Sequence, residues 1–409
     1  MYLSKDEERM LVGELGYAAQ KAMEILVALG KIYDAERLIP IKSAHVSGVS
    51  YANVGEDGLE FLEGLASDGR VVVKTTLNPA GMDLERWQLM NVSREFAENQ
   101  LRVIKVYKRM GIEVTCTCTP YLVGNEPRTG DHVAWSESSA VIYANSVIGA
   151  RTNRESGISA LAAAIAGRTP FYGLHVEENR QPTVEVRVPQ PKEELEFACL
   201  GILVGRLVGD GIPLFKGISH AEPDELKALG AALASVGGVP MFHVEGITPE
   251  AGRYTGKITD RITITESDIM GVKEEYACEA YPDLIFLGCP HLSLAEMERI
   301  ASALAGKKVK KNLWLCCSRR VKLEADRLGI TQAIEAAGGT ILCDTCPIVA
   351  PIRDLGVKAV ATNSAKGAWY SRNLNNLCVK LMSTEECIRE AHSSIPYQTE
   401  SYFYYESTP

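Results

Sequence analysis

Cysteines near the ends of apolar runs are the residues of this chain best suited to chemistry. Cys343 and Cys346 form a CxxC pair, and Cys289 lies in the stretch Gly288-Cys289-Pro290-His291. A CxxC pair alone fits a zinc half-site, a redox dithiol, iron–sulfur ligation or two buried core thiols. A third cysteine favours a metal, since a redox dithiol needs only two. Zinc needs four nitrogen or sulfur ligands, and His291 could supply one. Three thiolates on an iron–sulfur cluster would instead leave one iron open to a substrate oxygen.

The expected secondary structure explains why these residues would meet. Apolar runs at 283–287, 313–316, 340–343 and 357–361 alternate with helical stretches at 294–304, 321–337 and from about 369. This alternation predicts a parallel sheet covered on both faces. Ligands of such sheets bind beyond the carboxyl ends of the strands. Cys289, the CxxC pair and the segment Asn363-Ser364-Ala365-Lys366 each follow a strand, so we expect them at one edge of the sheet.

The N-terminal part repeats this pattern more loosely. Residues 71–76 and 112–116 are predicted to be strands, followed by loops that carry Asn78 and Cys118. His45 to Ser50 would occupy the same kind of position. Cys116 and Cys118 would face one side of their strand, and Cys118 is the better placed because it is nearer the carboxyl end.

We therefore expect an α/β protein made of several α/β/α domains, with mostly parallel sheets and an active site at the carboxyl ends of strands. The Pro- and charge-rich stretch near residue 190 precedes a helix predicted at 194–208. The predicted division is an N-terminal α/β domain at 1–190, a middle α/β segment at 191–270 and a C-terminal doubly wound domain at 271–409, which carries Cys289 and Cys346.

Composition limits the partners. The 409 residues include 43 Lys and Arg against 52 Asp and Glu, a formal net charge of −9. A basic footprint for nucleic acid or an anionic membrane is absent, although a local basic pocket for a small anion remains possible. No apolar run approaches the length of a membrane span, and the acidic N-terminus does not read as a signal peptide. We expect a soluble cytoplasmic protein.

The other cysteines are expected to be free. Eleven cysteines without an export signal indicate a reducing compartment rather than a disulfide framework. Cys199, Cys378 and Cys387 lie in stretches that read as helical and are expected in the core. Cys278 precedes a strand and has no partner motif.

Several motifs together resemble one family. They are Lys74-Thr75-Thr76-Leu77-Asn78-Pro79, Cys116-Thr117-Cys118-Thr119-Pro120-Tyr121, Trp135-Ser136-Glu137-Ser138-Ser139-Ala140, Asn145 to Glu155, Phe286 to His291, Asp344-Thr345-Cys346 and Asn363 to Lys366. In these residues, and over essentially its whole length, the chain resembles aconitase X, the divergent branch of the aconitase superfamily.

The resemblance implies an iron–sulfur hydro-lyase, with a cluster that is most simply [4Fe–4S]. Cys289 and Cys346 rank first as its ligands, Cys118 next and Cys343 last. Bacterial members fuse a small swivelling domain to this part, whereas this chain ends at Pro409, so we expect the large subunit of an archaeal-type two-subunit form. The activity implied is dehydration of (R)-mevalonate 5-phosphate to trans-anhydromevalonate 5-phosphate in a variant mevalonate pathway. The small partner would supply the serine base.

Residue roles follow from that chemistry. Eliminating water from a hydroxy acid removes a C–H proton and expels hydroxide, and His45 or His291 could protonate the leaving oxygen. For each histidine the alternative is a structural role. The substrate's carboxylate and phosphate would be bound by Ser47, Ser50, Lys74, Asn78, Arg151, Arg154, Ser364 and Lys366. Ser138, at a Ser-rich helix N-terminus, would offer a further anion site or simply cap the helix.

Two alternative functions stay open. One is the same chemistry on another hydroxy acid, such as cis-3-hydroxy-L-proline. The other is a non-enzymatic zinc or iron–sulfur binding protein.

Overall fold

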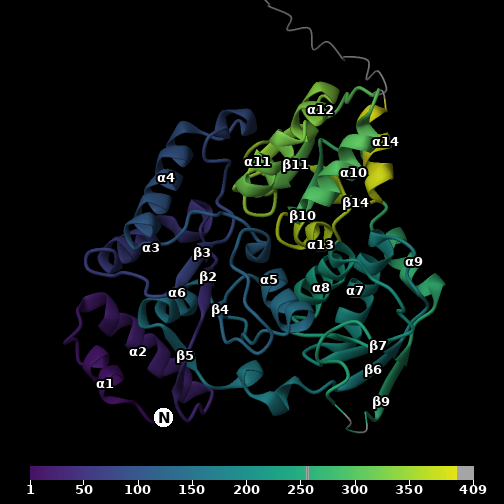
Figure 1. Ribbon diagram of the computed structural model, residues 1–409. Coiled ribbons are helices and arrows are strands. Elements are labelled where there is room, and N and C mark those ends of the chain that lie inside the picture. Colours follow the sequence, from purple (N-terminus) through teal and green to yellow (C-terminus); the bar gives the residue numbers. More distant parts are fainter. Residues whose placement is uncertain (255, 257, 394–409) are drawn as a thin grey trace, which may run out of the picture.

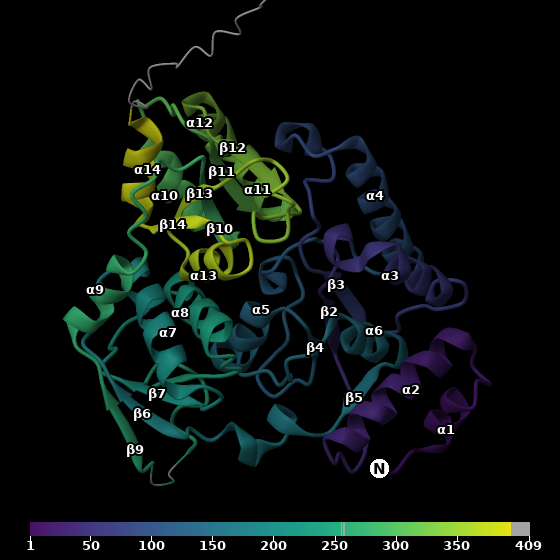
Figure 2. The same ribbon diagram turned by 180° about the vertical axis from the view of Figure 1, so that it is seen from behind.

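The computed structural model describes residues 1–254, 256 and 258–393, and the chain has the predicted mixed α/β fold with mostly parallel sheets (Figures 1 and 2). Residues 394–409 of the predicted third domain lie outside the described residues. Among those described, no helix combines the length and the apolar character needed to cross a bilayer.

The first part has a parallel sheet of order β3-β2-β4 and a separate antiparallel pair, β1 with β5. Helix α6 packs on β2 and β4, and α2 packs on α6, which buries an Ala- and Leu-rich core. The elements are α1 (Lys5–Leu11), α2 (Tyr17–Ile32), β1 (Leu38–Pro40), β2 (Ser43–Val46), α3 (Tyr51–Leu65), β3 (Lys74–Leu77), α4 (Arg94–Arg109), β4 (Ala134–Trp135), α5 (Ser138–Tyr143), α6 (Gly157–Ala166) and β5 (Arg168–Pro170).

The middle part is a four-stranded parallel sheet of order β8-β7-β6-β9, with α7 and α8 packed against each other beside it (Figure 1). Helix α7 has the bounds that the sequence predicted. Its elements are β6 (Val184–Arg187), α7 (Glu194–Val208), β7 (Pro213–Lys216), α8 (Pro223–Val236), β8 (His243–Val244), β9 (Asp260–Thr263) and α9 (Glu266–Glu274). Strand β6 ends before residue 190 but belongs to the middle sheet. If the chain is divided so that each part holds one main sheet, the first boundary therefore lies before β6 rather than at residue 190. The domain boundaries themselves stay a prediction.

The third part is a five-stranded parallel sheet of order β12-β11-β10-β13-β14. Its elements are β10 (Leu284–Leu292), α10 (Leu294–Leu304), β11 (Leu313–Cys317), α11 (Arg319–Arg327), α12 (Ile330–Ala337), β12 (Thr340–Cys343), β13 (Ala359–Thr362), α13 (Ala365–Asn373), β14 (Cys378–Leu381) and α14 (Thr384–His392). Strand alternation separates two cores. Ile285 and Leu287 face the layer of α10, α11, α12 and α14, whereas Leu284 and Phe286 face the core shared with the middle part.

The three parts meet where α5, α8 and α13 lie side by side (Figure 1). Helix α8 packs against both α5 and α13, so each part contributes a helix to this centre. The loops beyond the strands of the first and third sheets face one another there, and the candidate site lies among them.

One predicted strand, 71–76, is right only from residue 74 onward, and another, 112–116, is wrong. Residues 71–73 are outside β3, which begins at Lys74 because its partner β2 begins at Ser43. The β-branched valines favour an extended backbone but do not specify which residues find a partner. Residues 112–116 form one isolated bridge, Thr76 with Glu113, and Cys116 has a φ of 40°, which a strand does not allow.

Two helix predictions also need correction. The helix expected at 321–337 is broken into α11 and α12 at Gly329, whose φ is 74°. The helix expected from about 369 begins at Ala365, because the side chain of Ser364 caps it by accepting the backbone N–H of Gly367 at 2.8 Å.

The expectation of free thiols fails at one pair. Cys278 and Cys378 form a disulfide, with their Cα atoms 5.6 Å apart. Cys378 was expected in a helical core but is exposed at the start of edge strand β14. The bridge Ala277–Lys380 brings the two segments together, a pairing that no local sequence signal reveals. The other nine cysteines are free and buried.

Candidate active site

Three of the four cysteines ranked as ligands come together where the first part meets the third. The thiols of Cys289 and Cys346 lie close enough that each shifts the pKa of the other. The thiol of Cys118 accepts the backbone N–H of His291 at 3.1 Å, and nearby Cys346 raises the pKa of Cys118. All three side chains are buried. The strand-end argument placed Cys289, Cys343 and Cys346 at one edge of the third sheet and Cys118 at a comparable position in the first part. The structure brings Cys118 to Cys289 and Cys346 but not to Cys343.

A bulge in β10 presents Cys289. The register of β10 against β11 shifts between Leu287 and Leu292, so the strand continues past the point where it was expected to end. Gly288 has a φ of 102°, and a Cβ there would lie 2.1 Å from the carbonyl oxygen of Cys316. Only glycine allows that approach, and bulges of this kind re-aim the next side chain. The hydroxyl of Ser364 donates to the carbonyl of Cys289.

Cys343 lies apart from this group. It is the last residue of β12 and, by strand alternation, faces the layer of α10, α11 and α12. Cys317, the residue opposite it in β11, lies close enough to raise the pKa of the Cys343 thiol. The two cysteines of the CxxC pair therefore enter different cores, which supports Cys343's last place among the candidates.

His291 is fully engaged by protein groups. Its Nε2 lies 2.9 Å from the carbonyl of Thr345, and its Nδ1 lies 2.9 Å from the hydroxyl of Thr117. A carbonyl only accepts, so Nε2 carries the proton and Nδ1 accepts from Thr117. Burial lowers the pKa of His291 to about 4. The neutral ring ties the Cys118 and Cys346 loops together and has no nitrogen left for a zinc ion or a substrate.

His45 differs because one ring nitrogen is without a partner. Nδ1 lies 2.9 Å from the hydroxyl of Thr76, whereas Nε2 is buried with no hydrogen bond among the described residues. Burial lowers the pKa of His45 to about 4, and the nearby carboxylate of Glu137 opposes this only in part. Oδ1 of Asn78, on the neighbouring strand end, is likewise buried without a hydrogen bond, and the Asn78 side chain lies close enough to His45 to oppose the lowering of its pKa. Buried polar atoms normally have partners, so this pair is suited to a ligand.

Lys366 forms a buried ion pair that joins two parts of the chain. Its ammonium contacts the carboxylate of Glu137 and lies 3.1 Å from the hydroxyl of Ser139. Burial lowers the pKa of Lys366, but Glu137, Cys289 and Cys118 together raise it above its ordinary value. Burial likewise raises the pKa of Glu137, and Lys366 with the N-terminal groups of α5 brings it below its ordinary value.

Three further predicted binders lie around this centre. Ser364 caps α13 beside Cys289, and Ser138 approaches the Glu137 carboxylate at 3.4 Å. The hydroxyl of Ser50 donates to the carbonyl of Val349, just after Cys346, at 2.9 Å. The structure thus uses Ser50 and Ser364 to hold the cysteine-bearing loops.

The remaining predicted binders have partners of their own. Lys74 stands at the amino end of β3, and its Nζ lies 3.9 Å from Glu113. Ser47 bonds with Ser136 beside His45. Arg151 pairs with Glu177, and Arg154 donates to the carbonyl of Gly238 at 2.9 Å. None of these contacts joins the residue to the three cysteines.

Sequence reasoning missed Glu137 as a site residue. It accepts the backbone N–H of Ala140 at 2.7 Å and the hydroxyl of Ser139 at 2.6 Å, in addition to its contact with Lys366. The available signal was an acidic residue within a run of serines that opens a helix, a position where a carboxylate can cap the helix and hold a charge.

The three buried cysteines are the type of ligand that an iron–sulfur cluster requires. Among residues 1–254, 256 and 258–393, no group of three or more His, Cys, Asp or Glu side chains is arranged to hold a single metal ion. A cluster is wider than one ion and is bound mainly by cysteine thiolates. Burial raises the pKa of Cys118 to about 12, but the Lys366 ammonium and the backbone N–H of His291 favour its thiolate. Cys346 and burial raise the pKa of Cys289, which Lys366 opposes only in part, whereas Cys289 lowers the pKa of Cys346.

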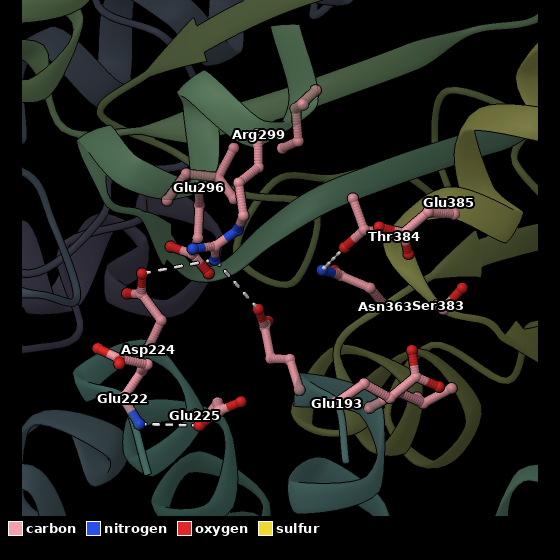
Figure 3. Close-up of a pocket in the computed structure, with 14 residues that line it drawn as sticks. Glu193, Glu222, Asp224, Glu225, Glu296, Arg299, Asn363, Ser383, Thr384 and Glu385 are labelled. Carbon is pink, nitrogen blue, oxygen red and sulfur yellow. Dashed lines mark hydrogen bonds and ion pairs between the residues drawn. The ribbon is translucent and has the colours of Figure 1, made fainter. Parts of the chain in front are cut away.

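A separate acidic pocket of about 250 Å³ opens between the middle and third parts (Figure 3). It lies at the N-termini of α7, α8, α10 and α14, where Glu222, Asp224, Glu225, Glu296 and Glu385 are gathered. Acidic residues at helix N-termini complement the helix dipole, and Glu225 and Glu296 complete capping boxes. A surface so rich in carboxylates is not suited to an anionic substrate. A smaller cavity of about 20 Å³ shares Glu194 and Glu296 with it and reaches Cys289 and Lys366.

Comparison with protein families gives three adjoining matches. Residues 1–178, 182–274 and 282–393 match the models of the aconitase X first, second and third domains.

Individual proteins that resemble this chain carry related names. The phosphomevalonate dehydratase large subunit of Methanothermobacter thermautotrophicus is 52% identical over 373 residues, covering 90% of this chain and 94% of that protein. The Thermococcus kodakarensis protein of the same name is 49% identical, covering 96% and 100%. The cis-3-hydroxy-L-proline dehydratase of Pseudomonas aeruginosa is 35% identical, covering 94% and 69%. The crystal structure of Thermococcus kodakaraensis aconitase X in its holo-form superposes with a TM-score of 0.90 at 49% identity, covering 96% of this chain and all of that one.

Proposed function

Because the chain belongs to the aconitase X family, we propose that it is the large subunit of a phosphomevalonate dehydratase that holds an iron–sulfur cluster. In this reaction (R)-mevalonate 5-phosphate is the single reactant, and it is converted into trans-anhydromevalonate 5-phosphate and water. The observation that carries the proposal is the identity of 40–52% to five large subunits of that name, against 35–36% to hydroxyproline dehydratases.

Cys118, Cys289 and Cys346 are the proposed ligands. They would hold a [4Fe–4S] cluster through three thiolates, and such a cluster would supply one open iron as a Lewis acid for the substrate's carboxylate and hydroxyl oxygens. Cys343 is not needed for this set. The engagement of both His291 nitrogens removes the fourth ligand that the zinc alternative required.

The hydrogen bond to the leaving hydroxyl is assigned to His45. Burial lowers its pKa to about 4, so the ring is neutral near pH 7 and its Nε2 is free to donate a hydrogen bond, whereas both nitrogens of His291 are occupied. Asn78, whose Oδ1 is also unpartnered, would orient the substrate beside it. The base that takes the C–H proton is proposed to come from a small subunit, in keeping with the large-subunit name of the relatives.

Anaerobic purification of the complex of both subunits tests the proposal. Iron and acid-labile sulfide should be present, and the complex should remove water from (R)-mevalonate 5-phosphate but not from cis-3-hydroxy-L-proline, as followed by mass spectrometry of the products. Zinc without acid-labile sulfide would overturn the cluster assignment. Conversion of cis-3-hydroxy-L-proline but not of (R)-mevalonate 5-phosphate would overturn the substrate assignment.

A further inference from the structure

The loop that carries Cys346 is held by a segment of the first part in addition to His291 of its own sheet. The segment is the loop of residues 78–86, which follows β3. Ala80 donates its backbone N–H to the carbonyl of Asp344 at 2.7 Å. In return, Oδ2 of Asp83 accepts the backbone N–H of Cys343 at 2.8 Å, and Oδ2 of Asp344 accepts that of Leu84 at 3.3 Å. The two loops therefore fix each other through backbone groups.

Arg319 closes this arrangement from a third direction. It is the first residue of α11, and its Nη2 lies 3.3 Å from Oδ1 of Asp83 and contacts Oδ2 of Asp344. Its Nη1 lies 2.5 Å from Glu85. Asp83 and Asp344 are only 1% and 2% exposed, so the guanidinium is what compensates their buried charge.

The arrangement also stabilises an unfavourable backbone conformation. Asp344 has a φ of 65°, in the left-handed region that few residues other than glycine adopt. Such a residue persists where its surroundings determine its conformation, and both its carbonyl and its carboxylate are bound here. Asp344 precedes Cys346 by two residues, so its φ decides where the chain directs that thiol.

We propose that Asp83 and Arg319 are positioning residues, which hold the 343–346 loop so that the thiol of Cys346 meets Cys118 and Cys289. This rests on the proposed function, because it takes Cys346 to be a cluster ligand. Neither residue touches the thiols; both act through Asp344 and the backbone of Cys343. Groups that orient metal ligands in this way typically change metal retention or activity by about 10–100-fold when replaced.

The test compares Asp83→Asn with Arg86→Gln in the anaerobically purified two-subunit complex. Asp83→Asn keeps the size of the side chain but removes the charge shared with Arg319. Arg86 belongs to the same loop and pairs with Glu335 of the third part at 2.8 Å, yet does not contact the 343–346 loop. We expect a chelator to remove iron about 10-fold or more faster from Asp83→Asn than from the wild type. The Arg86→Gln complex should match the wild type.

A second readout does not need the metal. Backbone amides of residues 343–349 should exchange with deuterium faster in Asp83→Asn and not in Arg86→Gln. Arg319→Lys keeps a cation and should retain more iron than Arg319→Gln, and this pair carries the test if Asp83→Asn does not fold. Equal iron loss from Asp83→Asn and Arg86→Gln in an iron-loaded enzyme would overturn the positioning role alone. A wild-type complex without iron and sulfide would overturn the proposed function itself.

Discussion

At the scale of single residues, the cysteines show that spacing is a poor guide to role. Cys343 and Cys346 form the CxxC pair, but Cys343 ends a strand and faces away, while Cys346 lies three residues further along a loop. The partners of Cys346 are Cys118 and Cys289, which are distant in sequence.

This difference predicts opposite results for two alanine variants. Cys343→Ala should keep wild-type iron and sulfide and lower the free energy of unfolding by about 1–2 kcal/mol, because it removes only a buried thiol packed on Cys317. Cys289→Ala should lose most of its iron and sulfide. Metal analysis and urea unfolding of both proteins check this, and loss of the cluster from Cys343→Ala would show that Cys343 is a ligand.

The ion pair of Lys366 and Glu137 gives a prediction about pH. In the wild type the lowered pKa of Glu137 stabilises the fold above its ordinary value of 4.5, and this contribution is lost as pH falls through the folded pKa. Lys366→Met leaves Glu137 buried without a cation, which should lower stability by about 3–5 kcal/mol at neutral pH. Burial would then raise the pKa of Glu137, so the variant should lose stability as pH rises above 4.5.

Urea unfolding between pH 4 and 7 measures the two slopes. The double variant Lys366→Met with Glu137→Gln is the control, because it removes the buried charge and should be less sensitive to pH than Lys366→Met. If the free energy of unfolding of Lys366→Met had the same pH dependence as that of the wild type, the Lys366–Glu137 ion pair would contribute little to stability.

At the scale of elements, the bulge in β10 connects sheet geometry to the site. Gly288→Ala would place a methyl group against the carbonyl of Cys316 and force a left-handed φ on alanine. We expect a loss of stability of about 1–3 kcal/mol and faster loss of iron to a chelator. Gly306 is a matched control, since its φ is 71° but a Cβ there meets nothing within 4 Å. Gly306→Ala should destabilise the fold without affecting iron, and equal iron loss from both variants would contradict the role of the bulge.

Sequence patterns predicted the elements wherever periodicity alone decides them. The third part reads correctly as a parallel α/β sheet because its strands are short apolar runs between amphipathic helices, and α7 was predicted with its observed bounds. Residues 71–76 were misplaced because valines favour extended backbone without specifying a partner. The strand-end rule placed Cys289 and Cys346 together correctly but also placed Cys343 with them. Cys118 joins the two although residues 112–116 are not a strand, and the roles of these cysteines as ligands stay predictions.

The rest of the site depends on contacts between distant residues. Glu137 meets Lys366 across 229 residues, and Asp83 meets Arg319 across 236. Nothing in the local sequence of Asp83 distinguishes it from a surface aspartate in a turn. Likewise, Arg151 and Arg154 stand in a promising motif, yet the fold gives them Glu177 and the carbonyl of Gly238 as partners.

At the scale of the whole molecule, the site depends on how firmly the parts are joined. The segment that ends α9 is tied to the third part by several contacts. Lys273 pairs with Glu386 at 2.8 Å, Tyr276 accepts the backbone N–H of Leu381, and the disulfide links Cys278 to Cys378. The disulfide encloses a loop of 100 residues that holds most of the third sheet.

That disulfide predicts how the protein responds to a reductant. Closing a loop of this length restricts the unfolded chain, so reduction should lower the free energy of unfolding by about 2–5 kcal/mol. Cys378 is exposed, so a dithiol should reach the bond in the folded protein. Thermal unfolding with and without dithiothreitol measures the effect, and mass spectrometry after thiol alkylation reports the state of the bond. The double variant Cys278→Ser with Cys378→Ser should start at the lower stability and show no response. The same response in that variant would trace the effect to other thiols, and alkylation of both cysteines without reductant would show that the bond does not form.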